Sequence, residues 1–307
     1  MIPTRPGEPC MGSSSAQRSR TCEGPHIEGS RFVTAAGIKW HLQQFGSGPC
    51  MLLVHGTGLA GHSWHDVAPI LAHDFTVIAP DLPGHACTSA PPAAQLSLPA
   101  MANSLGALLQ ELGARPTIVA GHSAGAAVLV RMVLDGAIRP KVVVSINGAL
   151  LPLRGVPRWL YSPLAKLLAH SALVSQLIAR RAADPHTITR LIDSTGSKLD
   201  SNAIEYYRQL AQRPEHVAAA LGMMANWDLR PLQRQLPQLK VPLSLWAASQ
   251  DRTIAPSEAL RVKALLPSAE LISLGALGHL AHEERPAQIA ELLARTATRF
   301  GALAGLC

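Results

Sequence analysis

Short apolar runs with the length of buried strands recur along the chain and alternate with stretches that carry apolar residues at helical spacing. The intervening stretches, such as residues 98–112 and 286–300, repeat their apolar positions every three or four residues. This alternation is typical of parallel strands joined by crossover helices, and it predicts an α/β fold with a mostly parallel sheet of about eight strands and helices on both faces. The strand-like runs are Met51 to Val54, Phe75 to Ala79, Thr117 to Ala120, Val142 to Ile146, Leu243 to Ala247 and Leu271 to Leu274.

Three segments depart from this alternation. Residues 31–34 and 38–42 flank Ala36-Gly37 and predict a hairpin with a Gly turn, which opens the sheet. Between about Leu150 and Arg230 helical stretches follow one another without a strand, which predicts a helical lid inserted after the Val142 to Ile146 strand. Residues 1–30 are rich in Ser, Gly, Pro and Arg and predict a disordered tail. We therefore expect an α/β core of residues 31–150 and 231–307 and a lid of residues 151–230.

Composition supports a folded chain with a large core, because 48% of the residues are hydrophobic and only 15% are charged. No uninterrupted apolar run of spanning length and no signal peptide are visible, so a cytoplasmic location is expected. The five Cys are widely spread and form no CxxC pair or Cys/His cluster, which predicts reduced, incidental thiols. The net charge is +7, and eleven Lys or Arg against six Asp or Glu lie between Leu150 and Arg234. These charges do not interleave with aromatic residues as in nucleic-acid-binding modules, so no nucleic-acid partner is expected.

The strongest chemical signal is Gly121-His122-Ser123-Ala124-Gly125, which follows a predicted strand and precedes a predicted helix. A G-x-S-x-G in this context is a nucleophile elbow, in which a tight turn holds the Ser in strained geometry and the Gly residues avoid clashes. Its alternative is a Gly-rich turn with an idle hydroxyl. We expect Ser123 to be a nucleophile held at the carboxyl edge of the sheet.

A serine nucleophile needs a base and an acid, which follow it in the chain in this kind of site. Asp251, just past the strand Leu243 to Ala247, is the expected acid, and a helix-capping or turn Asp is the alternative. The other position for an acid, after the Val142 to Ile146 strand, holds Asn147. His279 is the expected base, because it lies after Gly278 in the loop between the last strand and the last helix. The competing His282 lies among charged residues and is expected to be solvated.

An oxyanion hole is expected from the backbone N–H groups of Thr57, in His55-Gly56-Thr57-Gly58, and of Ala124, the residue after the nucleophile. His55 itself is expected to form structural hydrogen bonds at this turn. His62 and His65 are spaced as two metal ligands on a helix, but no carboxylate or thiolate ligand is apparent nearby. We therefore expect no metal site and no cofactor.

These motifs, with Asp81-Leu82-Pro83-Gly84-His85, resemble those of the α/β-hydrolase superfamily across residues 32–300. Within it, the chain is similar to the BchO family of magnesium-chelatase accessory proteins from bacteriochlorophyll-synthesising bacteria. The more specific matching segments are residues 195–200 (TGSKLD) and 223–229 (MMANWDL). One departure is Ala86, where many relatives have Gly. The resemblance implies a role in bacteriochlorophyll biosynthesis near the magnesium-insertion step, magnesium-chelatase subunits as partners, and peripheral contact with the photosynthetic membrane.

Three functions remain open at this stage: a serine hydrolase of this pathway, a non-catalytic porphyrin-binding or chelatase accessory protein, and a generic carboxylesterase. The ligand would be a small molecule, with a porphyrin or its ester as a candidate. Serine at the elbow disfavours the epoxide-hydrolase and dehalogenase branches, which use a carboxylate nucleophile. Aromatic and Met residues of the predicted lid would line a wide pocket, or form ordinary core: Trp159, Tyr161, Tyr206, Tyr207, Met223, Met224 and Trp227.

Overall fold

A computed structural model describes residues 29–152 and 171–303 of the chain. In these residues one eight-stranded sheet has the order β1-β2-β4-β3-β5-β6-β7-β8. The first two pairings in this order are antiparallel and the other five are parallel, so the predicted α/β fold is confirmed. The strands are β1 Ser30–Ala35, β2 Ile38–Phe45, β3 Cys50–Val54, β4 Thr76–Pro80, β5 Ile118–His122, β6 Val142–Ile146, β7 Leu243–Ala247 and β8 Glu270–Ser273.

The two-residue turn between β1 and β2 confirms the predicted hairpin. Ala36 and Gly37 both have positive φ values, 49° and 75°. Two successive positive φ values give a turn whose twist matches that of the flanking strands, and Gly adopts this conformation without a steric penalty. The register pairs Ala35 with Ile38 next to the turn and continues to Ser30 and Gln43.

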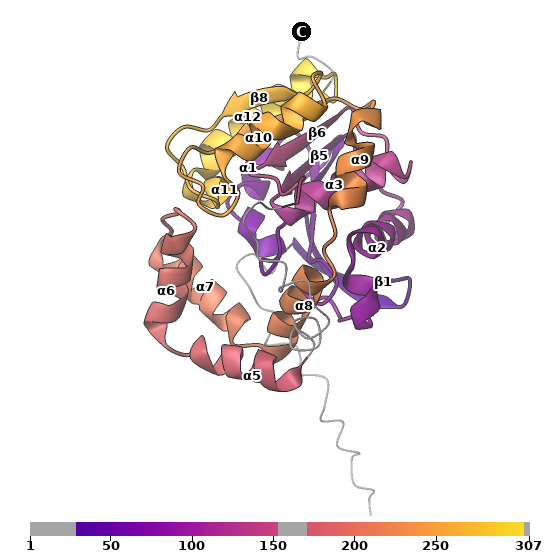
Figure 1. Cartoon of the computed structure of the whole chain (residues 1–307). Coiled ribbons are helices and arrows are strands. Elements are labelled where there is room, and N and C mark those ends of the chain that lie inside the picture. The colour runs from indigo at the N-terminus through magenta and orange to yellow at the C-terminus, as the bar shows by residue number, and fades with distance from the viewer. Residues whose placement is uncertain (1–28, 153–170, 304–307) are drawn as a thin grey trace, which may run out of the picture.

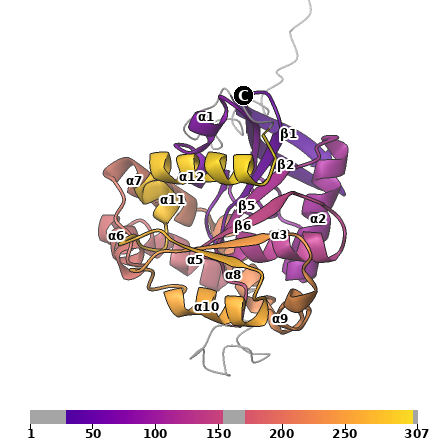
Figure 2. The same cartoon turned by 90° about the horizontal axis from the view of Figure 1, so that it is seen from above.

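Alternating side chains of the central strands pack on opposite faces of the sheet, as the pleat requires. In β3, Leu52 and Val54 join the core cluster that includes α2 and α3, whereas Met51 and Leu53 join the cluster that includes α1 and α12. Figure 2 shows α12 on one side of the sheet and α10 on the other. Both faces of the central strands are therefore buried, which explains their nearly continuous apolar sequences.

The helices on the core are α1 Ala68–Leu71, α2 Leu98–Glu111, α3 Ala124–Leu134, α9 Arg230–Gln235, α10 Pro256–Leu265, α11 Ala281–Glu284 and α12 Pro286–Arg299. Short 3-10 helices cover Gly61–Trp64, Ala93–Leu96 and Leu236–Gln238.

Among the described residues, four further helices lie between β6 and α9. They are α5 Ala172–Arg181, α6 Pro185–Ser194, α7 Ser201–Ala211 and α8 Pro214–Ala225, and we call them the inserted helices. Figure 1 shows them together at one end of the molecule, away from α10 and α12. Residues 1–28 of the expected disordered tail and residues 153–170 of the predicted lid lie outside the described residues. Ser30, which was expected in the tail, begins β1. No helix in the described part of the chain is long and apolar enough to cross a membrane.

Candidate active site

Ser123 occupies a tight turn between β5 and α3. Its φ of 52° and ψ of −119° are unusual for a residue with a side chain and are a source of local strain. A Cβ atom on Gly121 would lie 2.4 Å from the backbone nitrogen of Ala126, and one on Gly125 would lie 2.3 Å from the carbonyl oxygen of Val54. Only glycine fits at these two positions, which accounts physically for both Gly residues of the motif.

Asp251 and His279 form a buried hydrogen-bonded pair, with side chains only 1% and 8% exposed. His279 Nδ1 lies 2.8 Å from Asp251 Oδ2. Asp251 Oδ1 accepts hydrogen bonds from the backbone N–H groups of Thr253 and Ile254, at 2.7 and 2.8 Å. The carboxylate is thereby fixed, and with Nδ1–H donating to it, Nε2 is the ring nitrogen left to accept a proton.

Asn147 ties the loop of His279 to the sheet. Its Nδ2 donates to the carbonyl oxygens of Gly278 and His279, at 3.0 and 2.9 Å, and its Oδ1 accepts from the N–H of Ala248 at 2.9 Å. From the sequence, Asn147 was noted only because it occupies the other position at which the catalytic acid could lie. A polar residue directly after a buried strand was the signal available, but its partners come from segments 101 to 132 residues away in the chain.

The residue before the proposed nucleophile also holds this loop. His122 Nε2 lies 2.9 Å from the carbonyl oxygen of His279, and the two rings are 4.6 Å apart. Burial lowers the pKa of His122 well below its usual value, so the ring is neutral and Nε2–H donates. Ser123 and His279 thus lie on neighbouring loops, although among the described residues no hydrogen bond joins the Ser123 hydroxyl to the His279 ring.

The loop after β3, which contains His55 and Thr57, packs against the elbow. A Cβ atom on Gly56 would lie 2.9 Å from Cβ of Ser123. His55 Nε2 accepts from the N–H of Leu82 at 2.8 Å, which confirms its expected structural role. Ala124 begins α3, so its N–H is one of the free donors at a helix start. The hydroxyl of Thr57 contacts Met223 Sδ at 3.4 Å, which brings the loop against α8.

His216 of α8 bridges the loops that follow β3 and β4. Burial lowers its pKa to about 4, so the ring is neutral near pH 7. Its Nε2 donates to the carbonyl oxygen of Gly58, and its Nδ1 accepts from the N–H of Ala86, both at 3.1 Å. Ala86 has a φ of 42°, in the left-handed region that favours glycine.

The expectation that His282 is solvated is wrong, because its side chain is fully buried. Its ring lies 4.4 Å from that of Trp64 and 4.5 Å from that of His122. Burial lowers the pKa of His282 to about 3 and raises the pKa of the neighbouring Glu283 to about 8. Both side chains are therefore uncharged near neutral pH, and their 3.6 Å contact is not an ion pair. The short helix α11 turns these polar residues inward, which the surrounding charged sequence did not indicate.

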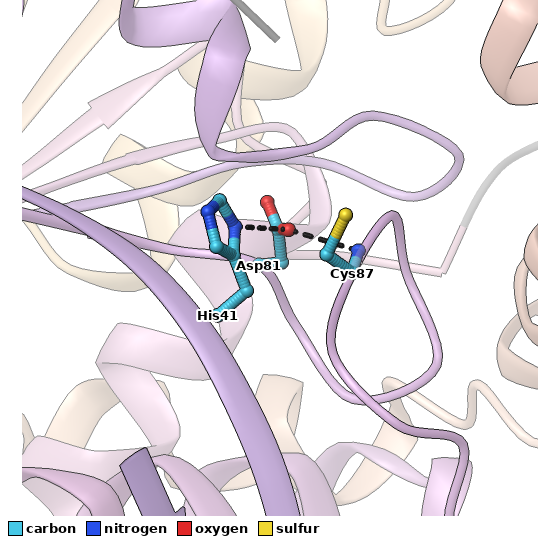
Figure 3. A group of neighbouring side chains, drawn as sticks. All are labelled: His41, Asp81 and Cys87. Carbon is cyan, nitrogen blue, oxygen red and sulfur yellow. Dashed lines mark hydrogen bonds and ion pairs between the residues drawn. The ribbon is translucent and has the colours of Figure 1, made fainter. Parts of the chain in front are cut away.

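His41, Asp81 and Cys87 form a polar cluster whose candidate ligand atoms lie within 4.8 Å of one another (Figure 3). Asp81 accepts from His41 Nδ1 at 2.8 Å, from the N–H of Gly61 at 2.7 Å and from the N–H of Cys87 at 3.1 Å. Burial would raise the pKa of Asp81, but the bond from His41 and the other donors outweigh it and lower this pKa to about 2. We call this cluster the structural clamp, because its hydrogen bonds tie the loop after β4 to β2 and to Gly61.

The sulfur of Cys87 is not available as a thiolate ligand in this cluster. Cys87 takes part in a disulfide, so the expectation of reduced thiols is wrong for this residue. The Arg213 guanidinium also lies 3.8 Å from Cys87 Sγ, where its charge would oppose a bound cation.

Most of the aromatic and Met residues expected in the lid pack as core where the structure describes them. Tyr207 and Met223 are buried, and Tyr206 packs on His62 with ring centroids 3.6 Å apart. Met224 is instead 54% exposed, while Trp227 packs partly buried against the core. Trp159 and Tyr161 lie outside the described residues.

The sequence pattern that defines the α/β hydrolase fold matches residues 49–286. The chain belongs to this family. It is 38% identical over 248 residues to the magnesium-chelatase 30 kDa subunit of Rhodobacter capsulatus, which covers 80% of this chain and 86% of that protein. This relative confirms the resemblance drawn from the sequence motifs.

Two further relatives carry names of esterases. Pimeloyl-[acyl-carrier protein] methyl ester esterase of Aeromonas hydrophila is 26% identical, over 82% of this chain and 96% of that protein. A solved structure of a thermophilic esterase from Thermogutta terrifontis matches with a TM-score of 0.69 at 23% identity, covering 88% of this chain and 98% of that one. The second likeness supports the fold alone.

Proposed function

We propose that this protein is a serine hydrolase that cleaves an ester or a related acyl bond, with Ser123 as nucleophile, His279 as base and Asp251 as the orienting acid. The observation that carries the proposal is the buried hydrogen bond between Asp251 and His279 beside the strained elbow of Ser123. Membership of a hydrolase fold family supports a hydrolase in general terms.

In this mechanism the Ser123 hydroxyl attacks the acyl carbon while His279 Nε2 takes its proton. Asp251 accepts from Nδ1–H and stabilises the imidazolium that forms. The N–H groups of Thr57 and Ala124 would bind the oxyanion of the tetrahedral intermediate. Proton return from His279 releases the alcohol, and a water activated by the same ring then hydrolyses the acyl-serine bond.

The proposed pathway rests on the similarity to the relative named magnesium-chelatase 30 kDa subunit. We place the reaction in bacteriochlorophyll biosynthesis near magnesium insertion, with a porphyrin or its ester as the small-molecule substrate. Chelatase subunits are the proposed protein partners.

Hydrolysis of a short ester and labelling by a fluorophosphonate test the proposed nucleophile. Ser123→Ala is expected to keep the fold, lose labelling and lose at least about 10³-fold in kcat/KM, because the three residues act as a unit. The matched control is Ser201→Ala, which removes an exposed hydroxyl at the start of α7 and should leave both readouts unchanged. Equal rates for wild type and Ser123→Ala would contradict the assignment.

The second candidate is a non-catalytic porphyrin-binding accessory protein, which the name of the same relative favours. Titration with protoporphyrin, its magnesium form and their methyl esters separates the two candidates. Saturable binding of the pigments by a chain that shows no Ser123-dependent hydrolysis would support the accessory role. Ser123-dependent cleavage of a methyl ester would support the hydrolase, and a rate confined to generic short esters would favour a carboxylesterase.

A further inference from the structure

The turn between α6 and α7 lies against the loops of both Asp251 and His279. Thr195 caps the end of α6, Gly196 follows with a φ of 84°, and Asp200 caps the start of α7. Residues 195–197 lie between two of the inserted helices, far from both loops in the chain, but contact both loops in the fold. We call residues 195–197 the wedge turn.

The wedge turn binds the backbone on either side of the proposed acid and base. The carbonyl oxygen of Thr195 accepts from the N–H of Arg252, next to Asp251, at 3.1 Å, and from the N–H of His279 at 3.4 Å. The buried hydroxyl of Ser197 accepts from the N–H of Leu280 at 2.8 Å. The wedge turn therefore accepts hydrogen bonds from two consecutive backbone N–H groups, those of His279 and Leu280.

Direct backbone packing adds to these hydrogen bonds. A Cβ atom on Gly196 would lie 2.0 Å from the carbonyl oxygen of Gln250, which precedes Asp251. A Cβ atom on Gly278 would lie 2.3 Å from the carbonyl carbon of Gly196. The two glycines thus let three backbone segments pass close together, and the wedge turn packs against both loops. The two loops also bond directly to each other, because the N–H of Gln250 donates to the carbonyl oxygen of Leu277 at 3.0 Å.

The opposite side of His279 is held by the sheet, because Asn147 and His122 both donate to its carbonyl oxygen. Its N–H, in contrast, has its partner in the insertion. The ring can face both Asp251 and Ser123 only if the backbone between these two anchors keeps its position.

We propose, on the basis of the proposed hydrolase function, that Ser197 and Gly196 are positioning residues for the Asp251 and His279 pair. The packing of the inserted helices on the core then determines whether the His279 ring is aligned with Asp251 and Ser123. Displacement of the α6–α7 turn would remove the acceptors of the His279 and Leu280 N–H groups and misalign the ring. Misplacement by about 1 Å is enough to reduce a rate about 10²-fold.

The decisive variant is Ser197→Ala, which removes the acceptor of the Leu280 N–H without adding volume. We expect kcat for ester hydrolysis to fall about 10- to 100-fold with KM within about two-fold, because the alignment of the base changes and substrate contacts do not. Ser197→Thr keeps the hydroxyl and should recover most of kcat. The control is Ser194→Ala, whose exposed hydroxyl donates to the carbonyl oxygen of Leu191 in its own helix.

A second readout does not depend on activity. The NMR signal of the His279 Nδ1–H, protected by its bond to Asp251, should be present in wild type and Ser194→Ala and should be broadened or lost in Ser197→Ala. Gly196→Ala should show the larger loss, with circular dichroism as the check on folding. A Ser197→Ala protein with the wild-type signal and wild-type kcat would overturn the positioning role. If wild type shows no Ser123-dependent hydrolysis, the proposed function fails, and the NMR comparison still decides the role of the wedge turn.

Discussion

The replacement of Glu283 by Gln tests whether the buried carboxyl is neutral in the folded protein. Glu283 has a side chain only 3% exposed, and its Oε1 accepts a hydrogen bond from the hydroxyl of Tyr207. Burial raises its pKa from 4.5 to about 8, although the bond from Tyr207 acts in the opposite direction. Gln has nearly the same shape, keeps an acceptor for Tyr207 and does not titrate.

The sign of the effect follows from proton linkage. Between pH 4.5 and about 8 the folded chain holds the Glu283 proton and the unfolded chain does not, so the free energy of unfolding falls as pH rises. The contribution is complete below pH 4.5 and is lost above about 8. At about 1.4 kcal/mol per pH unit, the stability of wild type relative to Glu283→Gln should fall by about 3 kcal/mol from pH 5.5 to 7.5.

Urea unfolding at several pH values, followed by circular dichroism, measures this difference. Buried histidines such as His62 and His282 titrate in both proteins, so their contributions cancel in the comparison. Glu291→Gln is the control, because Glu291 is 61% exposed on α12, and its curve should run parallel to that of wild type. Parallel curves for Glu283→Gln as well would show that Glu283 is already ionised in the fold and would refute the reasoning.

Three further substitutions test other parts of the structure. His279→Ala should match the activity loss of Ser123→Ala, whereas His282→Gln should stay within a few-fold of wild-type activity and lower stability instead, because Asp251 bonds to the ring of His279 and His282 packs against Trp64 and His122. The reverse ranking of ester hydrolysis rates would move the base to His282. Asp81→Asn should lower the free energy of unfolding by about 2 to 4 kcal/mol at pH 7, measured in urea, because an amide cannot accept all three hydrogen bonds; an unchanged midpoint would argue against the structural clamp.

The sequence alone predicted the features that depend on neighbouring residues. The apolar runs predicted the strands because both faces of a central parallel strand are buried, and Ala36-Gly37 predicted the first turn because its backbone needs positive φ values. The elbow of Ser123 was predicted for a similar local reason. A side chain on either of its two glycines would clash, with Ala126 a few residues away or with Val54 in the neighbouring strand β3. Asp251 and His279 were predicted by their position after strands, and the structure places their side chains in hydrogen-bond contact.

Only the tertiary structure decided which distant residues surround this pair. His282 lies among charged residues in the sequence, yet it is buried because α11 packs inward against Trp64. Asn147 and Ser197 hold the loop of His279 from segments far away in the chain. No local sequence motif indicates the hydrogen-bond partner of either residue. Periodicity and turn chemistry act over a few residues, whereas burial and hydrogen-bond partners depend on which strands and helices meet, and that information is spread over the whole chain.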